Sequence, residues 1–129
     1  MGHSRCGAVM AAVDLAIRSA DAAQETGCTG VGPILLNIQE DLPAEFFHQG
    51  RNLSGESLAD FVALVARRNV ITVVRRIREQ SPVENRMIEA AEIGIVGTRY
   101  DVRSGSPEFL DEPVAGMSAV DVKAAVNAD

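Results

Sequence analysis

The sequence predicts an α/β chain that consists mostly of helices and carries one strand pair near its C-terminal end. Apolar residues recur at helical spacing in two long stretches, residues 7–24 and 54–80. Residues 93–102 are rich in Ile, Val, Thr and Tyr, and a turn containing Ser and Gly follows them, which is typical of a strand that returns as a hairpin. We place the two strands at about 93–102 and 106–110.

Length and composition bound the class of protein. The chain has 129 residues, 47% of them hydrophobic, which is enough for one domain. We expect this domain over residues 1–110, followed by a C-terminal tail over 111–129. The net charge of −6 argues against nucleic acid as a partner. No apolar run reaches the length of a membrane span, no signal peptide is evident, and there are only two cysteines, so we expect a cytoplasmic protein that does not bind membranes.

The predicted elements follow one another closely in the first half of the chain. The helix over residues 7–24 is rich in Ala and Val, and glycines then break the chain around Cys28. Pro33 can open a short helix that extends to about Leu42. We expect a loop or an irregular helical turn over residues 43–52.

Residues 54–80 are predicted to be helical, but the direction of their apolar face changes along the stretch. The first apolar group is Leu58, Phe61, Val62 and Val65, and the second is Val70, Val73, Val74 and Ile77. The second group centres on a face rotated by more than about a hundred degrees from the first. We therefore expect a kink, or a change of packing partner, around residues 67–69.

Turn and cap signals organise the end of the chain. Ser81-Pro82-Val83-Glu84 is a capping box with proline at the first helical position, and it predicts a short helix to about Ala91. Beyond the hairpin, Ser118 is a candidate cap for a helix over residues 119–128, with a loosely held tail as the alternative. Tyr100 and Asp101 are interpreted as a strand-end packing residue and a turn-forming residue.

The start of the chain carries the clearest chemical signal. His3 and Cys6 lie three residues apart where the first helix is predicted to begin, and they are of the two residue types that zinc prefers as nitrogen and sulfur ligands. The positive end of the helix dipole would favour the thiolate form of Cys6. A zinc site needs three or four ligands, so this pair is at most half of one.

The octet Gly2-His3-Ser4-Arg5-Cys6-Gly7-Ala8-Val9 resembles the second zinc motif of the β-class carbonic anhydrases, where a strand ends and an alanine-rich helix begins. Residues 69–110 resemble the C-terminal part of the same family, with Ile93-Gly94-Ile95-Val96-Gly97 leading to Tyr100. The resemblance implies a truncated β-carbonic-anhydrase-like fold, with His3 and Cys6 as zinc ligands and carbon dioxide and bicarbonate as substrates.

The family also has an earlier Cys-Xaa-Asp-Xaa-Arg motif, which supplies a third zinc ligand and an Asp-Arg pair beside the metal. That motif does not occur in these 129 residues. The resemblance therefore implies a partial, C-terminal half of the enzyme, for which we assign no catalytic residue. Its strand would lack a neighbour in the family's mostly parallel sheet, so we expect a homo-oligomer or pairing with a missing N-terminal half, with a rearranged packing of the chain's own helices as the third alternative.

Two other residues, Cys28 and His48, are candidates for substitute zinc ligands. We interpret Cys28 as an idle or structural thiol and His48 as a surface or packing residue.

The first of the two functions is a zinc-dependent carbonic anhydrase, a lyase that hydrates carbon dioxide to bicarbonate only when the missing half is supplied. The alternative is a non-catalytic remnant that acts as an assembly or binding module.

Overall fold

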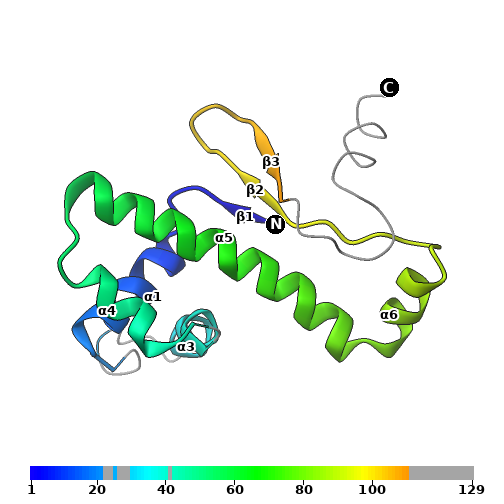
Figure 1. The fold of residues 1–129 in the computed structure, drawn as a ribbon, viewed down its shortest axis with the longest axis horizontal. Helices are drawn as coiled ribbons and strands as arrows, with labels where there is room; N and C mark the ends of the chain where they lie inside the picture. The colour runs from blue at the N-terminus through cyan, green and yellow to red at the C-terminus, as the bar shows by residue number, and fades with distance from the viewer. Residues whose placement is uncertain (22–24, 26–29, 41, 111–129) are drawn as a thin grey trace. The chain divides into compact units, whose positions relative to one another are not determined.

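The computed structural model describes residues 1–21, 25, 30–40 and 42–110 (Figure 1). The chain divides into two compact units, which we call the helical unit (Ser4–Asn69) and the sheet unit (Met1–His3 with the chain from Val70 onward). Helices dominate and a small sheet accompanies them, which confirms the predicted class. Of the described helices, none combines the length and the apolar character needed to cross a membrane.

The helical unit is built from α1 (Gly7–Arg18), α3 (Gly32–Glu40), α4 (Ala44–Gly50) and the first part of α5 (Gly55–Gln80). The four helices and Leu42, which lies between α3 and α4, contribute buried apolar residues to one cluster: Val9, Ala12, Val13, Leu15, Leu35, Ile38, Leu42, Phe47, Phe61, Val65 and Ala66. A side-chain hydrogen bond joins two of the helices, because Nε2 of Gln39 donates to the backbone oxygen of Ala12 at 2.8 Å. The helical spacing of apolar residues thus gives four helices a common core.

Helix α1 ends at Arg18, earlier than the predicted residue 24. Ser19 takes the left-handed conformation, with φ 55° and ψ 37°, and its N–H bonds to the oxygen of Ala16. The N–H of Ala20 bonds to the oxygen of Leu15 at 2.9 Å. These two bonds form a Schellman motif, which satisfies the last carbonyls of a helix and turns the chain away. The helical spacing of apolar residues did not reveal this stop, because Ser19 takes the place usually held by glycine.

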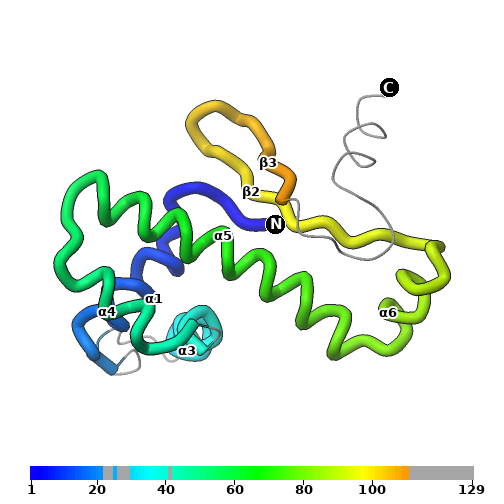
Figure 2. The backbone as a smooth tube through the Cα atoms, viewed as in Figure 1, coloured from blue at the N-terminus to red at the C-terminus, as the bar shows by residue number. Residues whose placement is uncertain are grey.

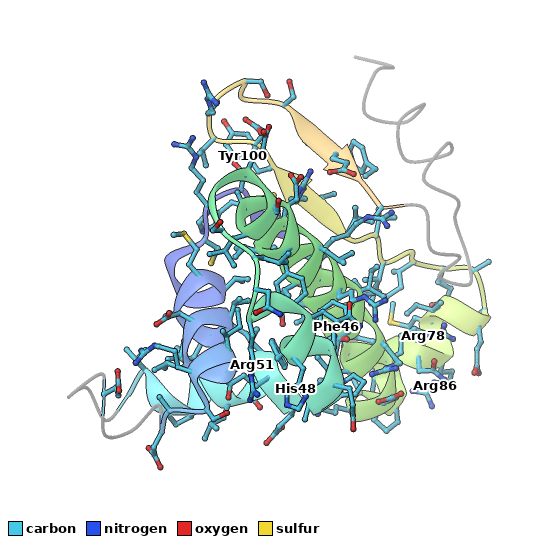
Figure 3. All side chains as sticks on the ribbon, turned by 60° about the vertical axis from the view of Figure 1, so that its left-hand side comes forward. Phe46, His48, Arg51, Arg78, Arg86 and Tyr100 are labelled. Atoms are coloured by element: carbon cyan, nitrogen blue, oxygen red, sulfur yellow. The ribbon has the colours of Figure 1, made fainter. Side chains whose placement is uncertain are left out.

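The segment after Pro43 is a regular helix, α4, rather than the loop or irregular turn that we expected. Phe47 is buried, and the ring of Phe46 stacks on that of Phe61 with centroids 5.0 Å apart. The guanidinium of Arg68 lies over the ring of Phe46, 5.0 Å from its centroid, in a cation–π contact. Phe46 is labelled in Figure 3. Aromatic packing in the folded chain therefore orders a segment whose own helical signal is weak.

Helix α5 runs without a break from Gly55 to Gln80, and its backbone can be followed in Figure 2. Its first part supplies Phe61 and Val65 to the core of the helical unit, whereas its second part supplies Val70 and Val74 to the sheet unit. The boundary between the units falls between Asn69 and Val70. Of the two predicted outcomes, the change of packing partner is confirmed.

The sheet unit contains a three-stranded sheet in the order β1-β2-β3, made of β1 (Gly2–His3), β2 (Thr98–Tyr100) and β3 (Pro107–Phe109). Strands β2 and β3 form the predicted antiparallel pair, but each is shorter than expected. The sequence pattern did not show strand β1, although the motif that the octet resembles ends a strand here, and β1 pairs parallel with β2. A strand is recognised only where a neighbouring strand pairs with its backbone N–H and C=O groups. Strands β1 and β3 pair only with residues of Thr98–Tyr100, so the rest of 93–102 is not a strand.

The predicted cap of the short helix is confirmed. Helix α6 (Pro82–Glu89) begins after Ser81, whose side-chain oxygen accepts the N–H of Glu84 at 3.4 Å. The backbone N–H of Ser81 instead bonds to the oxygen of Ile77 at 3.0 Å, so the end of α5 and the start of α6 share this residue. Arg78 and Asn85 then connect the two helices, with Nε of Arg78 donating to Oδ1 of Asn85 at 3.2 Å.

Asp101 closes the hairpin between β2 and β3, as the sequence predicted. Its Oδ1 accepts the backbone N–H of Arg103 at 2.8 Å and that of Ser104 at 2.9 Å. Gly105 takes a positive φ of 74° and donates its N–H to the backbone oxygen of Asp101. The hydrogen bonds from Ser104 and Arg103 stabilise the carboxylate and lower the pKa of Asp101 below its usual value.

This lowered pKa predicts an acid-sensitive hairpin. A carboxyl group whose pKa is lower in the folded state stabilises that state above its unfolded pKa, and the contribution is lost as the pH falls through the folded pKa. We expect Asp101→Asn, which keeps an acceptor oxygen but does not titrate, to lose less stability than the wild type between about pH 6 and pH 3. This range includes the pKa of an ordinary Asp side chain. Urea unfolding of both proteins across that range measures the difference. Equal losses would contradict the prediction.

Candidate metal site

Strand β1 places His3 at the edge of the sheet. Gly2 and His3 pair with Arg99 and Tyr100 of β2. A Cβ atom at Gly2 would lie 2.6 Å from Cγ2 of Val70, which is closer than real side-chain atoms approach. The absence of a side chain at Gly2 therefore lets β1 lie against α5. His3, the next residue, is exposed.

Cys6 lies at the start of α1, where the sequence placed it. It is the N-cap residue, with φ −61° and ψ 117°, and its backbone oxygen accepts the N–H of Met10 at 3.0 Å. Just before it, Arg5 takes a left-handed φ of 58°. The Cys6 side chain is half-buried, packs against the core of the helical unit, and makes no capping hydrogen bond. Its thiol thus has a packing role whether or not it binds metal.

The described residues do not fit a complete zinc site. His3 belongs to the sheet unit and Cys6 to the helical unit. Within residues 1–21, 25, 30–40 and 42–110, no three His, Cys, Asp or Glu side chains gather where they could hold a metal ion. Three protein ligands are the minimum for a catalytic zinc. The two predicted ligands therefore need donors from elsewhere.

Of the two substitute ligands considered from the sequence, only His48 lies among the described residues. His48 is an exposed residue of α4, labelled in Figure 3, and Asp101 is engaged in the hairpin turn. Cys28 lies outside the described residues.

Sequence reasoning did not single out Val70 and Gly97 as residues that shape the site. Gly97 precedes β2, and a Cβ atom there would lie 3.1 Å from Cγ1 of Val70. Val70 therefore fits against two glycines, Gly2 and Gly97, which are far apart in the sequence. The only signal for this contact was the presence of glycine in stretches that otherwise favour strands, which often marks a close backbone approach.

The geometry and the motif define a small α/β protein whose candidate metal ligands lie where a strand leads into a helix. A family model described as carbonic anhydrase matches residues 1–107. The chain therefore belongs to the carbonic anhydrase family, with the character of the β class. The family acts on carbon dioxide and bicarbonate and generally depends on zinc. Searches of curated proteins and of solved structures find no significant match.

Proposed function

We propose that this chain contributes two ligands, His3 and Cys6, to the zinc site of a carbonic anhydrase that interconverts carbon dioxide and bicarbonate. The octet that carries them lies inside the stretch matched by the family. The local structure supports the proposal, because a strand ends and a helix begins within the octet, as in the motif that it resembles, with a left-handed Arg5 between them. The proposal rests on this agreement between the sequence motif and the backbone structure.

The proposal includes a further requirement, that the chain alone is incomplete. The missing Cys-Xaa-Asp-Xaa-Arg motif has no counterpart in these 129 residues. A second copy of the chain would have the same sequence, so self-association cannot supply that motif. We propose that it comes from another polypeptide segment, whether or not the chain also forms homo-oligomers. A cytoplasmic location is part of the same proposal and is supported by the low cysteine content.

One observation favours the alternative function. The described residues bring no metal-binding group of three together, and the Cys6 side chain packs against an apolar core. A chain that kept its fold without its metal would have these features and would act as an assembly or binding module. Metal binding by Cys6 separates the two functions, because the module has no need of it.

The test is a cobalt titration of the purified chain and two variants. Cobalt substitutes for zinc in mixed nitrogen and sulfur sites, and thiolate ligation gives it a characteristic near-ultraviolet absorption. We expect this absorption in the wild type and its loss in Cys6→Ser, with weaker cobalt binding in His3→Ala. Cys28→Ser is the matched control and should keep the absorption. Equal spectra for the two cysteine variants would rule out Cys6 as a ligand and favour the module.

The same samples test the requirement for a second segment. Carbon dioxide hydration, followed by stopped-flow with a pH indicator, is expected to proceed at the buffer rate for the wild-type chain alone, with or without zinc. Two protein ligands do not hold the metal firmly enough for catalysis. Rapid hydration that depends on zinc and is lost in Cys6→Ser would show that the isolated chain is complete and would overturn this part of the proposal.

A further inference from the structure

Strand β1 rests on one side chain of α5, that of Val70. A Cβ atom at Gly2 would lie 2.6 Å from Cγ2 of Val70. Among the described residues that do not adjoin Gly2 in the chain, no other atom lies within 4 Å of that position. Strand β1 has only two residues, which lie beside β2 in Figure 1, so few backbone hydrogen bonds can fix it there. The contact with Val70 therefore matters for the position of β1.

The same valine also lies against the start of β2. A Cβ atom at Gly97 would lie 3.1 Å from Cγ1 of Val70, so the two methyl groups of one buried side chain face two glycines. The start of β2 has further support. The same Cβ position at Gly97 lies 3.6 Å from Cγ2 of Val74, and the N–H of Leu110 donates to the oxygen of Gly97 at 2.9 Å. A smaller residue at position 70 would thus leave β2 supported, whereas β1 would lose its contact at Gly2.

The alternation of side chains along β1 connects this contact to His3. Successive residues of a strand project to opposite faces, so His3 projects away from the face on which Gly2 meets Val70. His3 is paired with Tyr100 of β2, and both residues are exposed. Val70 therefore acts on the imidazole of His3 through the backbone of β1. A shift of Gly2 toward the space left by a smaller side chain would change the direction of the neighbouring Cα–Cβ bond of His3.

We propose that Val70 is a positioning residue for His3: it fixes β1 against α5 and so sets the direction in which the imidazole leaves the sheet. The inference rests on the proposed function in one respect, that His3 binds metal. A ligand that is held in place before binding loses less conformational freedom when the metal arrives. Residues that orient metal ligands typically change metal affinity by about 10–100-fold when they are replaced.

Histidine ring signals in proton NMR measure the position of His3 without any metal. The chain has two histidines, His3 and His48, and His3→Ala shows which signal belongs to which. In Val70→Ala we expect the His3 signal to shift toward that of free histidine, because a loosened β1 averages the surroundings of the ring. The signal of His48, which lies on α4 in the helical unit, is the internal reference and should stay in place.

Val74→Ala is the matched control for this variant. Val74 is the same residue type on the same helix and is also buried, with 8% exposed against 5% for Val70, but it does not lie within 4 Å of the Cβ position at Gly2. It should lower the stability of the chain and leave the His3 signal unchanged. Equal shifts of the His3 signal in the two variants would overturn the proposal.

Two further variants keep the proposal falsifiable if Val70→Ala does not fold. Val70→Thr keeps the branched shape but buries a hydroxyl group, so it should lower stability while the His3 signal stays near its wild-type position. Gly2→Ala forces β1 away from Val70 and should shift the His3 signal. A shifted signal in Val70→Thr, or an unshifted one in Gly2→Ala, would contradict the contact with Val70 as the origin of the effect.

Cobalt binding measures the consequence for the proposed metal site. The dissociation constant for cobalt is expected to rise about tenfold in Val70→Ala and to stay near the wild-type value in Val74→Ala. An unchanged constant in Val70→Ala, with the thiolate absorption still lost in Cys6→Ser, would overturn the positioning role and leave the proposed function standing. Absorption that does not depend on Cys6 would overturn the proposed function, whereas the ring signals of His3 would still decide whether Val70 positions it.

Discussion

Leu35→Ala is expected to destabilise the helical unit by about 2–5 kcal/mol, the usual cost of removing most of a large buried side chain. Leu35 is 0% exposed and lies on α3, in the cluster that α1, α4 and the first part of α5 share. Truncation to alanine would remove apolar contacts and leave a cavity that four helices cannot close without shifting. Urea unfolding followed by circular dichroism, compared with the wild type, measures the change in the free energy of unfolding.

The neighbouring residue provides the matched control for this prediction. Leu36 is the same residue type on the same helix, but it is 49% exposed. Leu36→Ala is expected to change the free energy of unfolding by less than about 1 kcal/mol, because most surface substitutions have small effects. Similar losses for the two variants would show that α3 does not face the core through Leu35, and would contradict the packing described for the helical unit.

Gly2→Ala is expected to cost about 1–3 kcal/mol, the typical penalty for forcing an extra methyl group into a packed region. The new Cβ atom would meet Cγ2 of Val70 at 2.6 Å, so either β1 would move away from β2 or α5 would shift. If β1 moves, the amide protons of this strand lose their protection. Hydrogen exchange and urea unfolding of the variant follow both effects.

A rescue and a control make this prediction specific. In a chain with Val70→Ala the methyl group at position 2 has room, so the cost of Gly2→Ala should become smaller than in the wild-type background, and a double-mutant cycle gives the difference. Gly7→Ala is the control, since no atom lies within 4 Å of the position of its added Cβ and it sits at the start of α1. An equal cost of Gly2→Ala in both backgrounds would refute steric contact with Val70 as its cause.

The chain's local signals were enough to predict much of its architecture. The Ser81-Pro82 cap, the Asp101 turn and the helices found within the predicted stretches 7–24 and 54–80 depend on residues within a few positions of one another. Such features are encoded in side-chain hydrogen bonds and apolar spacing that act over one or two helical turns. The octet likewise predicted the family, which the match to residues 1–107 confirms.

Features that depend on distant residues could not be predicted in the same way. The sequence did not indicate that Phe46 and Phe61 would stack and order α4. Strand β1 has only two residues, too few for any period to be recognised, and it exists because Thr98–Tyr100 pairs with it. Each of these features is stabilised by a partner many positions away.

By itself the sequence determined the helix-rich α/β class, the family and the identity of the two candidate metal ligands, because these reside in short motifs and in apolar spacing. The tertiary structure decided how α5 is shared: Phe61 and Val65 pack in one unit, and Val70 packs against Gly2 and Gly97 in the other. It also decided which sheet face stays exposed around Tyr100. The physical reason is that packing and strand pairing depend on which distant surfaces meet, and no local pattern encodes that choice.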